Sequence, residues 1–187
     1  MISPVRAILL PCVLVGSVAS AECPAAPDIS ATMDDLIAGV QAAGNERDAR
    51  VFSGQMWEQW VRAPDGRAQE LLDEGMERRA VFDLPGAIRA FDALVDYCPD
   101  YAEGYNQRAF ANFLDSDYAA ALPDLDRTLA LRPRHIAALA GRGLTLISMG
   151  RMEEGRAAIR EAVTLNPWLT ERHLLDLPDP PGGGVDL

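Results

Sequence analysis

The stretch YNQRAFANFLDSDYAAALPDLDRTLALRP, residues 105–133, decides the fold of this chain. Asp-Ser-Asp at 115–117 forms a polar break between two apolar segments. Leucines after the break recur at three- and four-residue spacing, which indicates one face of a helix. They are Leu122, Leu125 and Leu129. Because proline cannot continue a helix, Pro133 ends the second segment. The stretch therefore predicts two helices joined by a short turn.

The same pattern recurs every 34 residues on both sides of this stretch. Closing prolines stand at Pro99, Pro133 and Pro167. Three further columns repeat at the same step: Gly75, Ala109 and Gly143; Ala87, Ala121 and Gly155; Phe91, Leu125 and Ile159. Small residues in the first two columns suit positions where two helix backbones approach closely, and large residues such as Tyr105 and Phe91 are expected to fill the space between pairs. A fixed period with these residue types predicts a repeat architecture.

The repeats resemble the tetratricopeptide repeat family over about residues 68–167. The units LLDEGMERRAVFDLPGAIRAFDALVDYCP, YNQRAFANFLDSDYAAALPDLDRTLALRP and LAGRGLTLISMGRMEEGRAAIREAVTLNP all fit the family pattern. The departures are single columns. Leu71 and Leu139 replace the early aromatic, Phe82 and Ser116 replace the turn glycine that is kept as Gly150, and Thr128 replaces an alanine. The resemblance implies three units, at about 68–101, 102–135 and 136–169.

The segments outside the repeats are assigned from the same register. Residues 22–67 are expected to form a degenerate first helix pair, Ala31 to Ala43 and Glu46 to Val61, because Trp57 lies one period before Phe91. Residues 168–177 are expected to form the capping helix that a repeat array needs over its last apolar face. The tail, residues 178–187, is rich in proline and glycine and is expected to be disordered. The predicted fold class is all-α, a short α-solenoid of antiparallel helix pairs.

The N-terminus predicts export. Residues 1–21 hold one basic residue, a short apolar run and the small residues Ala19 and Ala21 as a cleavage signal, which is typical of a secretory signal peptide. The run is too short for a stable membrane anchor, so we expect no membrane insertion after cleavage. A retained N-terminal anchor is the alternative. The expected location is the periplasm or the exterior of the cell.

Composition argues against several classes of function. The formal net charge of −11 would repel nucleic acid. The chain contains no lysine, which excludes Schiff-base chemistry and lysine attachment of pyridoxal phosphate. The two histidines, His135 and His173, occupy structural columns and lack partners at metal-ligand spacing. We therefore expect no catalysis, no metal site and no cofactor, with an enzyme using His135 or His173 as a remote alternative.

The resemblance implies that the first helix of each unit lines a concave groove that binds a protein partner. By register, the expected groove residues are Met76, Arg79, Asn106, Phe110, Phe113, Leu144 and Ile147. Family members that grip a terminal carboxylate use basic residues and asparagine in this groove. Here those positions hold Leu72, Met76, Ala137 and Gly141, so that clamp is missing. The apolar strip that remains suits the apolar face of an amphipathic helix or peptide.

The groove could bind a partner, or it could be covered by other parts of the same chain. The strip could be covered by the chain's own N-terminal segment or C-terminal tail, and burial of Phe110 and Phe113 would decide for such self-coverage.

The expected function is that of a non-enzymatic periplasmic adaptor. An assembly factor or chaperone for an envelope or cytochrome complex is the alternative, and a co-purified client would distinguish it.

Cysteine usage completes the sequence-based expectations. After removal of the signal peptide only Cys23 and Cys98 remain of three cysteines. Because exported proteins meet an oxidising environment, we expect these two to form a disulfide. A reactive or intermolecular thiol is the alternative. The bridge would tie the mature N-terminus to the end of the first clear repeat.

Overall fold

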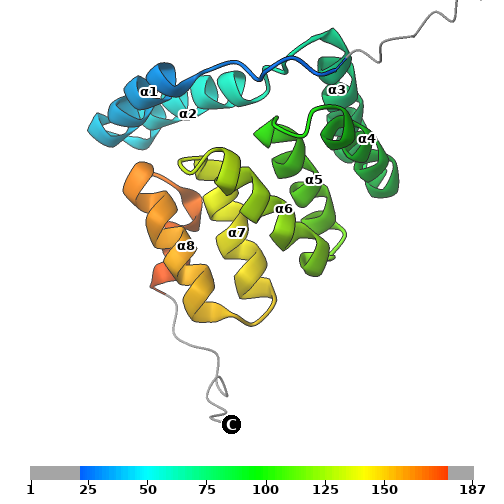
Figure 1. The fold of residues 1–187 in the computed structure, drawn as a ribbon. Helices are drawn as coiled ribbons and strands as arrows, with labels where there is room; N and C mark the ends of the chain where they lie inside the picture. The colour runs from blue at the N-terminus through cyan, green and yellow to red at the C-terminus, as the bar shows by residue number, and fades with distance from the viewer. Residues whose placement is uncertain (1–21, 177–187) are drawn as a thin grey trace, which may run out of the picture.

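The computed structural model of the chain describes residues 22–176. The predicted signal peptide, residues 1–21, and the predicted disordered tail, residues 178–187, lie outside the described residues. The described part is all-α, as predicted, and it follows the order shown in Figure 1. The helices are α1 Ser30–Ala42, α2 Glu46–Trp60, α3 Gly66–Ala80, α4 Leu84–Tyr97, α5 Ala102–Leu114, α6 Tyr118–Leu131, α7 Ile136–Ser148 and α8 Met152–Leu165, followed by the 3₁₀ helix η1 Thr170–Leu175.

Helices α3 to α8 form three stacked helix pairs, and within this series consecutive helices pack against each other. Within a pair, a large side chain of the second helix lies on a small residue of the first. The ring of Phe91 lies so close to Gly75 that a Cβ there would come within 2.3 Å of it, and the side chain of Ile159 lies over Gly143 in the same way. The small residues lie at close helix contacts, as predicted, but Phe91 packs inside its own pair and not between pairs as expected.

Polar side chains fix where several helices begin. Asp65, Asp83 and Asp117 accept hydrogen bonds from backbone N–H groups in the first turns of α3, α4 and α6. The Ala68 N–H and the Tyr97 hydroxyl hold the pKa of Asp65 below its usual value. Such caps satisfy backbone donors that the helix itself leaves free.

The turn inside each repeat has a left-handed residue at the position where the family has glycine. The φ angles are 60° at Phe82, 63° at Ser116 and 79° at Gly150. The prediction that Phe82 and Ser116 stand in glycine's place is confirmed. Because a bulky side chain is strained at positive φ, Phe82 holds an unfavourable conformation.

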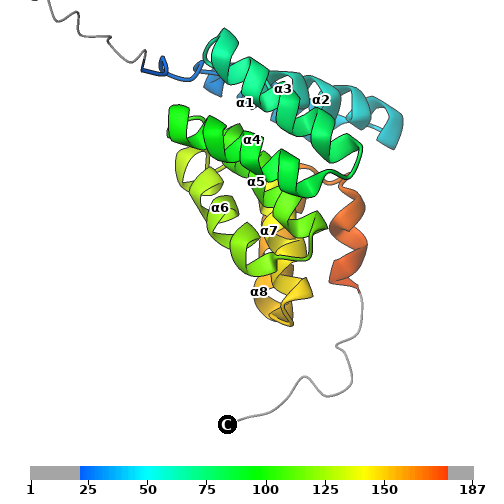
Figure 2. The ribbon, with the colours of Figure 1, turned by 90° about the vertical axis from the view of Figure 1, so that its right-hand side faces the viewer.

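The N-terminal helix pair is present, but it does not stack on α3 as a degenerate first repeat would. Buried residues of α1 and α2, among them Val40, Met56 and Trp60, form one core with Ile136, and Leu165 packs against that core. Residues of α3 and α4 form a separate core. Figure 1 shows the pair lying above the upper ends of α7 and α8, and Figure 2 shows it on the same side of the molecule as α3. The equivalence of Trp57 with Phe91 is therefore wrong, since Trp57 is 39% exposed and Phe91 is fully buried.

The expected capping helix is instead the short 3₁₀ helix η1, which has no buried residue. It packs on α8. Leu169, just before η1, packs against the core that α7 and α8 share. Helix α1 adds a contact to the same repeat, in which the Gln41 side chain donates to the carbonyl of Thr164 at 2.9 Å. The expected cap over the last repeat is therefore present as a 3₁₀ helix, and the N-terminal pair adds to it.

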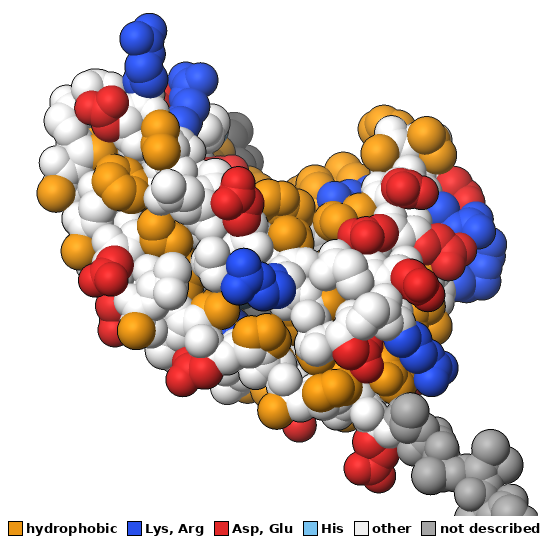
Figure 3. All heavy atoms as spheres, turned by 90° about the horizontal axis from the view of Figure 1, so that it is seen from above, with side chains coloured by type: hydrophobic (Ala, Val, Ile, Leu, Met, Phe, Trp, Pro, Cys, Tyr) orange, Lys and Arg blue, Asp and Glu red, His pale blue; other side chains and the backbone are white. Residues whose placement is uncertain are grey.

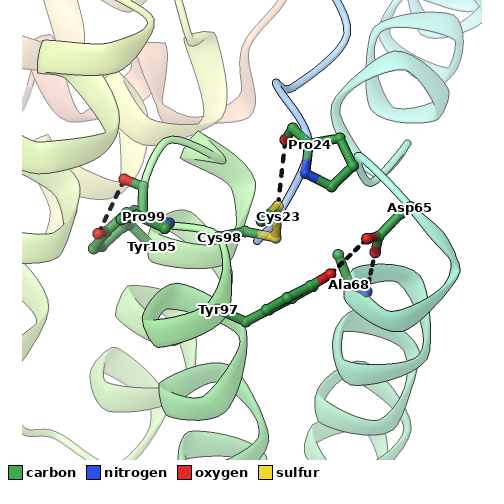
Figure 4. Close-up of a disulfide and its surroundings, with 8 residues drawn as sticks. All are labelled: Cys23, Pro24, Asp65, Ala68, Tyr97, Cys98, Pro99 and Tyr105. Atoms are coloured by element: carbon green, nitrogen blue, oxygen red, sulfur yellow. Dashed lines mark hydrogen bonds between the residues drawn. A yellow bond between two sulfur atoms is a disulfide. The ribbon is translucent and has the colours of Figure 1, made fainter. Parts of the chain in front are cut away.

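The predicted disulfide joins Cys23 to Cys98, with the two Cα atoms 5.2 Å apart. Cys98 is buried at the end of α4, beside the Tyr97 side chain that bonds Asp65 (Figure 4). From Cys23 the extended N-terminal segment, residues 22–29, crosses the top of the molecule to α1 (Figure 1). The Arg132 side chain donates to the carbonyl of Pro27 along this path, at 2.9 Å.

Replacing both cysteines by alanine should lower the free energy of unfolding by about 4 kcal/mol. The physical reason is that a bridge closing a loop of 75 residues restricts the unfolded chain. Urea denaturation followed by circular dichroism measures the change, and the wild-type protein in reductant should match the variant. A loss below about 1 kcal/mol, or two free thiols in the oxidised protein, would contradict the bridge.

Phe82→Gly should raise the free energy of unfolding by about 1 kcal/mol, because glycine adopts the left-handed conformation without strain. Val81→Gly is the matched control. Val81 is as exposed as Phe82, 76% against 75%, but its φ is −100°. The control should not stabilise the protein. Equal effects of the two substitutions in thermal denaturation would rule out strain at Phe82.

Candidate functional site

The concave side of the array holds a pocket of about 320 Å³, here called the concave pocket. Its lining comes from α3, α5 and α7, with further residues from α2, α6, η1 and the loop before η1. The side chains used below are Trp57, Arg79, Gln107, Phe110, Phe113, Leu144, Leu169 and Glu171. Seen from above, the molecule is hollowed between two lobes, and hydrophobic side chains gather in the hollow (Figure 3).

Most of the predicted groove residues meet in this pocket. They are Arg79, Asn106, Phe110, Phe113 and Leu144. Two of the predicted residues lie elsewhere. Met76 packs against the core of α3 and α4, and the Ile147 side chain lies over Gly155 of α8. Both belong to the packing inside a repeat and not to the pocket lining.

The register of the repeats missed the side of the pocket that comes from outside them. It is also lined by Trp57 of α2, by Leu169 of the loop before η1 and by Glu171 of η1. Self-coverage is nevertheless incomplete, because Phe110 is 45% exposed and Phe113 is half-buried. Within residues 22–176, the chain's own segments therefore narrow the groove without filling it.

A chain of polar side chains runs from the pocket into the interior. Arg79 donates to the side-chain oxygen of Gln107, and the Gln107 amide donates to Oε1 of Glu103. The Asn106 amide donates to the same oxygen at 3.0 Å. The other oxygen of Glu103 lies 2.8 Å from Nε2 of His135. Buried charges and amides are costly without hydrogen-bond partners. Helices α5 and α7 can therefore pack here only because this network satisfies their buried polar groups.

His135 is fully engaged at the point where the N-terminal pair meets the array. Its Nδ1 accepts the backbone N–H of Ala138 and thereby caps α7. Nε2 must then carry the proton and donate to Glu103, since the two nitrogens of a neutral imidazole divide these roles. The ring stacks on Trp60 with the centroids 4.2 Å apart. The residue is 1% exposed, which makes its role structural.

Arg79 carries the positive charge of the pocket. Its guanidinium lies over the ring of Phe110, 4.6 Å from the centroid, in cation–π geometry. Burial lowers the pKa of Arg79, and the negative charge of Glu103 opposes that shift. The side chain is thus a partly desolvated cation at the edge of an apolar surface.

Comparison with known proteins identifies the family. No family model matches the chain. The chain is 32% identical to Tetratricopeptide repeat protein 36 of Bos taurus over 141 residues, which cover 71% of each protein. The chain belongs to the tetratricopeptide repeat family. A TPR repeat-containing protein of Rhizobium etli is 32% identical over 84 residues, 45% of this chain and 37% of that relative. The matched region is thus little more than a third of the Rhizobium protein.

Solved tetratricopeptide repeat structures share the fold. The first TPR domain of Spaghetti (RPAP3) bound to an HSP90 peptide superposes with a TM-score of 0.58 at 22% identity, over 59% of this chain and 88% of that chain. The crystal structure of MamA gives 0.52 at 21% identity, over 67% and 85%. The tetratricopeptide repeat assignment and the predicted α-solenoid are confirmed.

The rest of this tetratricopeptide repeat protein offers few groups for chemistry. Within residues 22–176 there is no cluster of three or more side chains suited to a metal ion. None of the helices between these limits is long and apolar enough to cross a membrane. His173 is exposed on η1, where its Nδ1 lies 2.6 Å from the carbonyl oxygen of Thr170.

His135→Ala should lower the free energy of unfolding by about 3 kcal/mol or more. It removes the α7 cap and the stack on Trp60, and it leaves Oε2 of the buried Glu103 carboxylate without its partner. His173→Ala, on the exposed η1, is the matched control and should change stability by less than about 0.5 kcal/mol. Similar urea midpoints for the two variants would contradict the structural role of His135.

Proposed function

We propose that this protein is a non-enzymatic adaptor that binds an amphipathic helix or peptide of a protein partner in the concave pocket. The observation that carries the proposal is the partly exposed apolar surface of Phe110, Phe113 and Leu144. A folded protein gains from covering such a surface with apolar side chains of a partner. The neighbouring solved domains support a peptide-binding role, since two of them are described as complexes with HSP90 and pHsp70.

The proposed recognition rests on apolar anchors. The positions of the family's carboxylate clamp hold the side chains of Leu72, Met76 and Ala137 and the bare backbone of Gly141. Leu72 is completely buried in the core of α3 and α4 and cannot contact a ligand. The partner is therefore expected to insert aromatic or aliphatic side chains between α5, α7 and Trp57.

We also propose that the protein acts after export, in the periplasm. The disulfide between Cys23 and Cys98 supports this location, because structural disulfides persist in oxidising compartments. Cell fractionation with thiol labelling tests the location. Recovery of the protein in the cytoplasm with reduced cysteines would overturn it. Whether the bound partner is an assembly client or another envelope protein is decided by its identity in the crosslinking experiment below.

Phe110→Asp combined with Leu144→Asp should reduce partner capture at least tenfold while leaving helicity nearly unchanged. Two carboxylates in the pocket make burial of an apolar anchor unfavourable. The full chain, carrying a photo-crosslinking residue at Phe113, is expressed in its native host, and crosslinked proteins are identified by mass spectrometry. Val51→Asp is the control, because Val51 is 58% exposed and lies outside the pocket lining. Undiminished crosslinking by the double variant would refute the pocket as the binding site.

A further inference from the structure

We propose that the concave pocket selects an acidic amphipathic segment, one that places an aromatic or aliphatic side chain on Phe110 and a neighbouring Asp or Glu carboxylate on Arg79. This inference rests on the proposed function and specifies the chemistry of the partner. It follows from the contacts of Arg79, from the charges around the pocket and from the position of Arg79 beside the apolar lining.

The ion pairs of nearby arginines show what Arg79 lacks. Its sequence neighbour Arg78 pairs with Glu74 and Asp83, at 2.8 Å and 2.9 Å. Arg108 on the neighbouring helix pairs with Asp92 and Asp124. In the described part of the chain, Arg79 has no carboxylate within 4.0 Å, and its hydrogen-bond partner is the neutral amide of Gln107.

The nearest acid cannot supply the missing partner. Both oxygens of Glu103 are occupied by Asn106, Gln107 and His135, in a carboxylate that is 2% exposed. Gln107 lies between Glu103 and Arg79. A guanidinium has five N–H donors, so the bond to Gln107 leaves most of them for a ligand. A carboxylate bound there would gain charge-assisted hydrogen bonds in a partly dry site.

The charge around the pocket makes this preference specific. Arg79 is the one cationic side chain among the described pocket-lining residues. Glu171 is the acidic one, and it forms no ion pair with Arg79. The whole chain has a net charge of −11, which disfavours the binding of an anion at sites without a nearby cation. If a carboxylic acid binds more tightly than an uncharged analogue of the same shape, the binding is therefore to a specific site.

The geometry also sets the spacing within the partner. Because the guanidinium lies 4.6 Å from the centre of the Phe110 ring, the carboxylate must sit beside the apolar group that covers this ring. N-acetyl-L-phenylalanine carries both groups in one small molecule. N-acetyl-L-phenylalaninamide has the same shape without the charge. The pair isolates the contribution of the carboxylate.

The test titrates the full-length oxidised protein with each compound at pH 7 and follows the indole N–H of Trp57, another pocket residue, by NMR. The acid should bind about tenfold more tightly than the amide, since hydrogen bonds to charged groups contribute on the order of a factor of ten. In Arg79→Gln the acid should lose this advantage while the amide binds as before. Arg78→Gln, which removes an arginine already paired with Glu74 and Asp83, should retain the preference.

The outcomes separate this inference from the proposed function. Equal binding of acid and amide by the wild-type protein would overturn the acidic partner and leave apolar binding in the pocket intact. Persistence of the preference in Arg79→Gln would also overturn it. If neither compound shifts the Trp57 indole and Phe110→Asp with Leu144→Asp leaves crosslinking unchanged, the pocket itself is refuted and the inference falls with it.

Discussion

The stack of Trp60 on His135 is the contact on which the arrangement of the molecule depends. The indole comes from the last residue of α2, and the imidazole stands at the start of α7 and is bonded to Glu103 of α5. The Tyr101 hydroxyl donates to the carbonyl of Trp60 at 2.8 Å and so also holds the end of α2 in place. Burial raises the pKa of Tyr101, which keeps it a hydrogen-bond donor. These contacts place the N-terminal pair over the third repeat, and that placement brings Trp57 to the pocket.

The apolar core of the N-terminal pair outweighs the disulfide in holding the pair there. Each large apolar side chain buried in it contributes roughly 1.5–3 kcal/mol, against about 4 kcal/mol for the bridge. Several such side chains, including Ile37, Val40 and Met56, are at most 2% exposed. The bridge therefore acts chiefly on the extended segment between Cys23 and α1, and the helix pair itself is held by packing.

The sequence predicted what is local and repeated. The 34-residue period fixed the register of each helix pair, so the close helix contact at Gly75 and the position of the turn at Phe82 could be predicted without coordinates. The docking of α1 and α2 could not. Their apolar faces fit either α3 or the third repeat by pattern alone, and the choice depends on contacts between residues about 75 to 110 positions apart, such as Trp60 with His135 and Ser53 with Asn166. Periodicity carries no information on such pairs.

The residues of the candidate site also fall into two groups, those that the repeat register predicts and those that it does not. Residues near the centre of the groove helices, such as Phe110 and Leu144, lie in the pocket because register alone determines their direction. Trp57 and Glu171 come from elements outside the repeat and reach the pocket only through the docking of the ends. The polar chain beneath the pocket links the two groups, since Arg79 is held through Gln107 and Glu103 by the same His135 that supports Trp60. Loss of a buried member such as Glu103 or His135 leaves a neighbour unsatisfied, whereas the half-buried Arg79 stands at the solvent end of the network. The charge that faces the pocket and the packing that shapes it therefore have one structural origin.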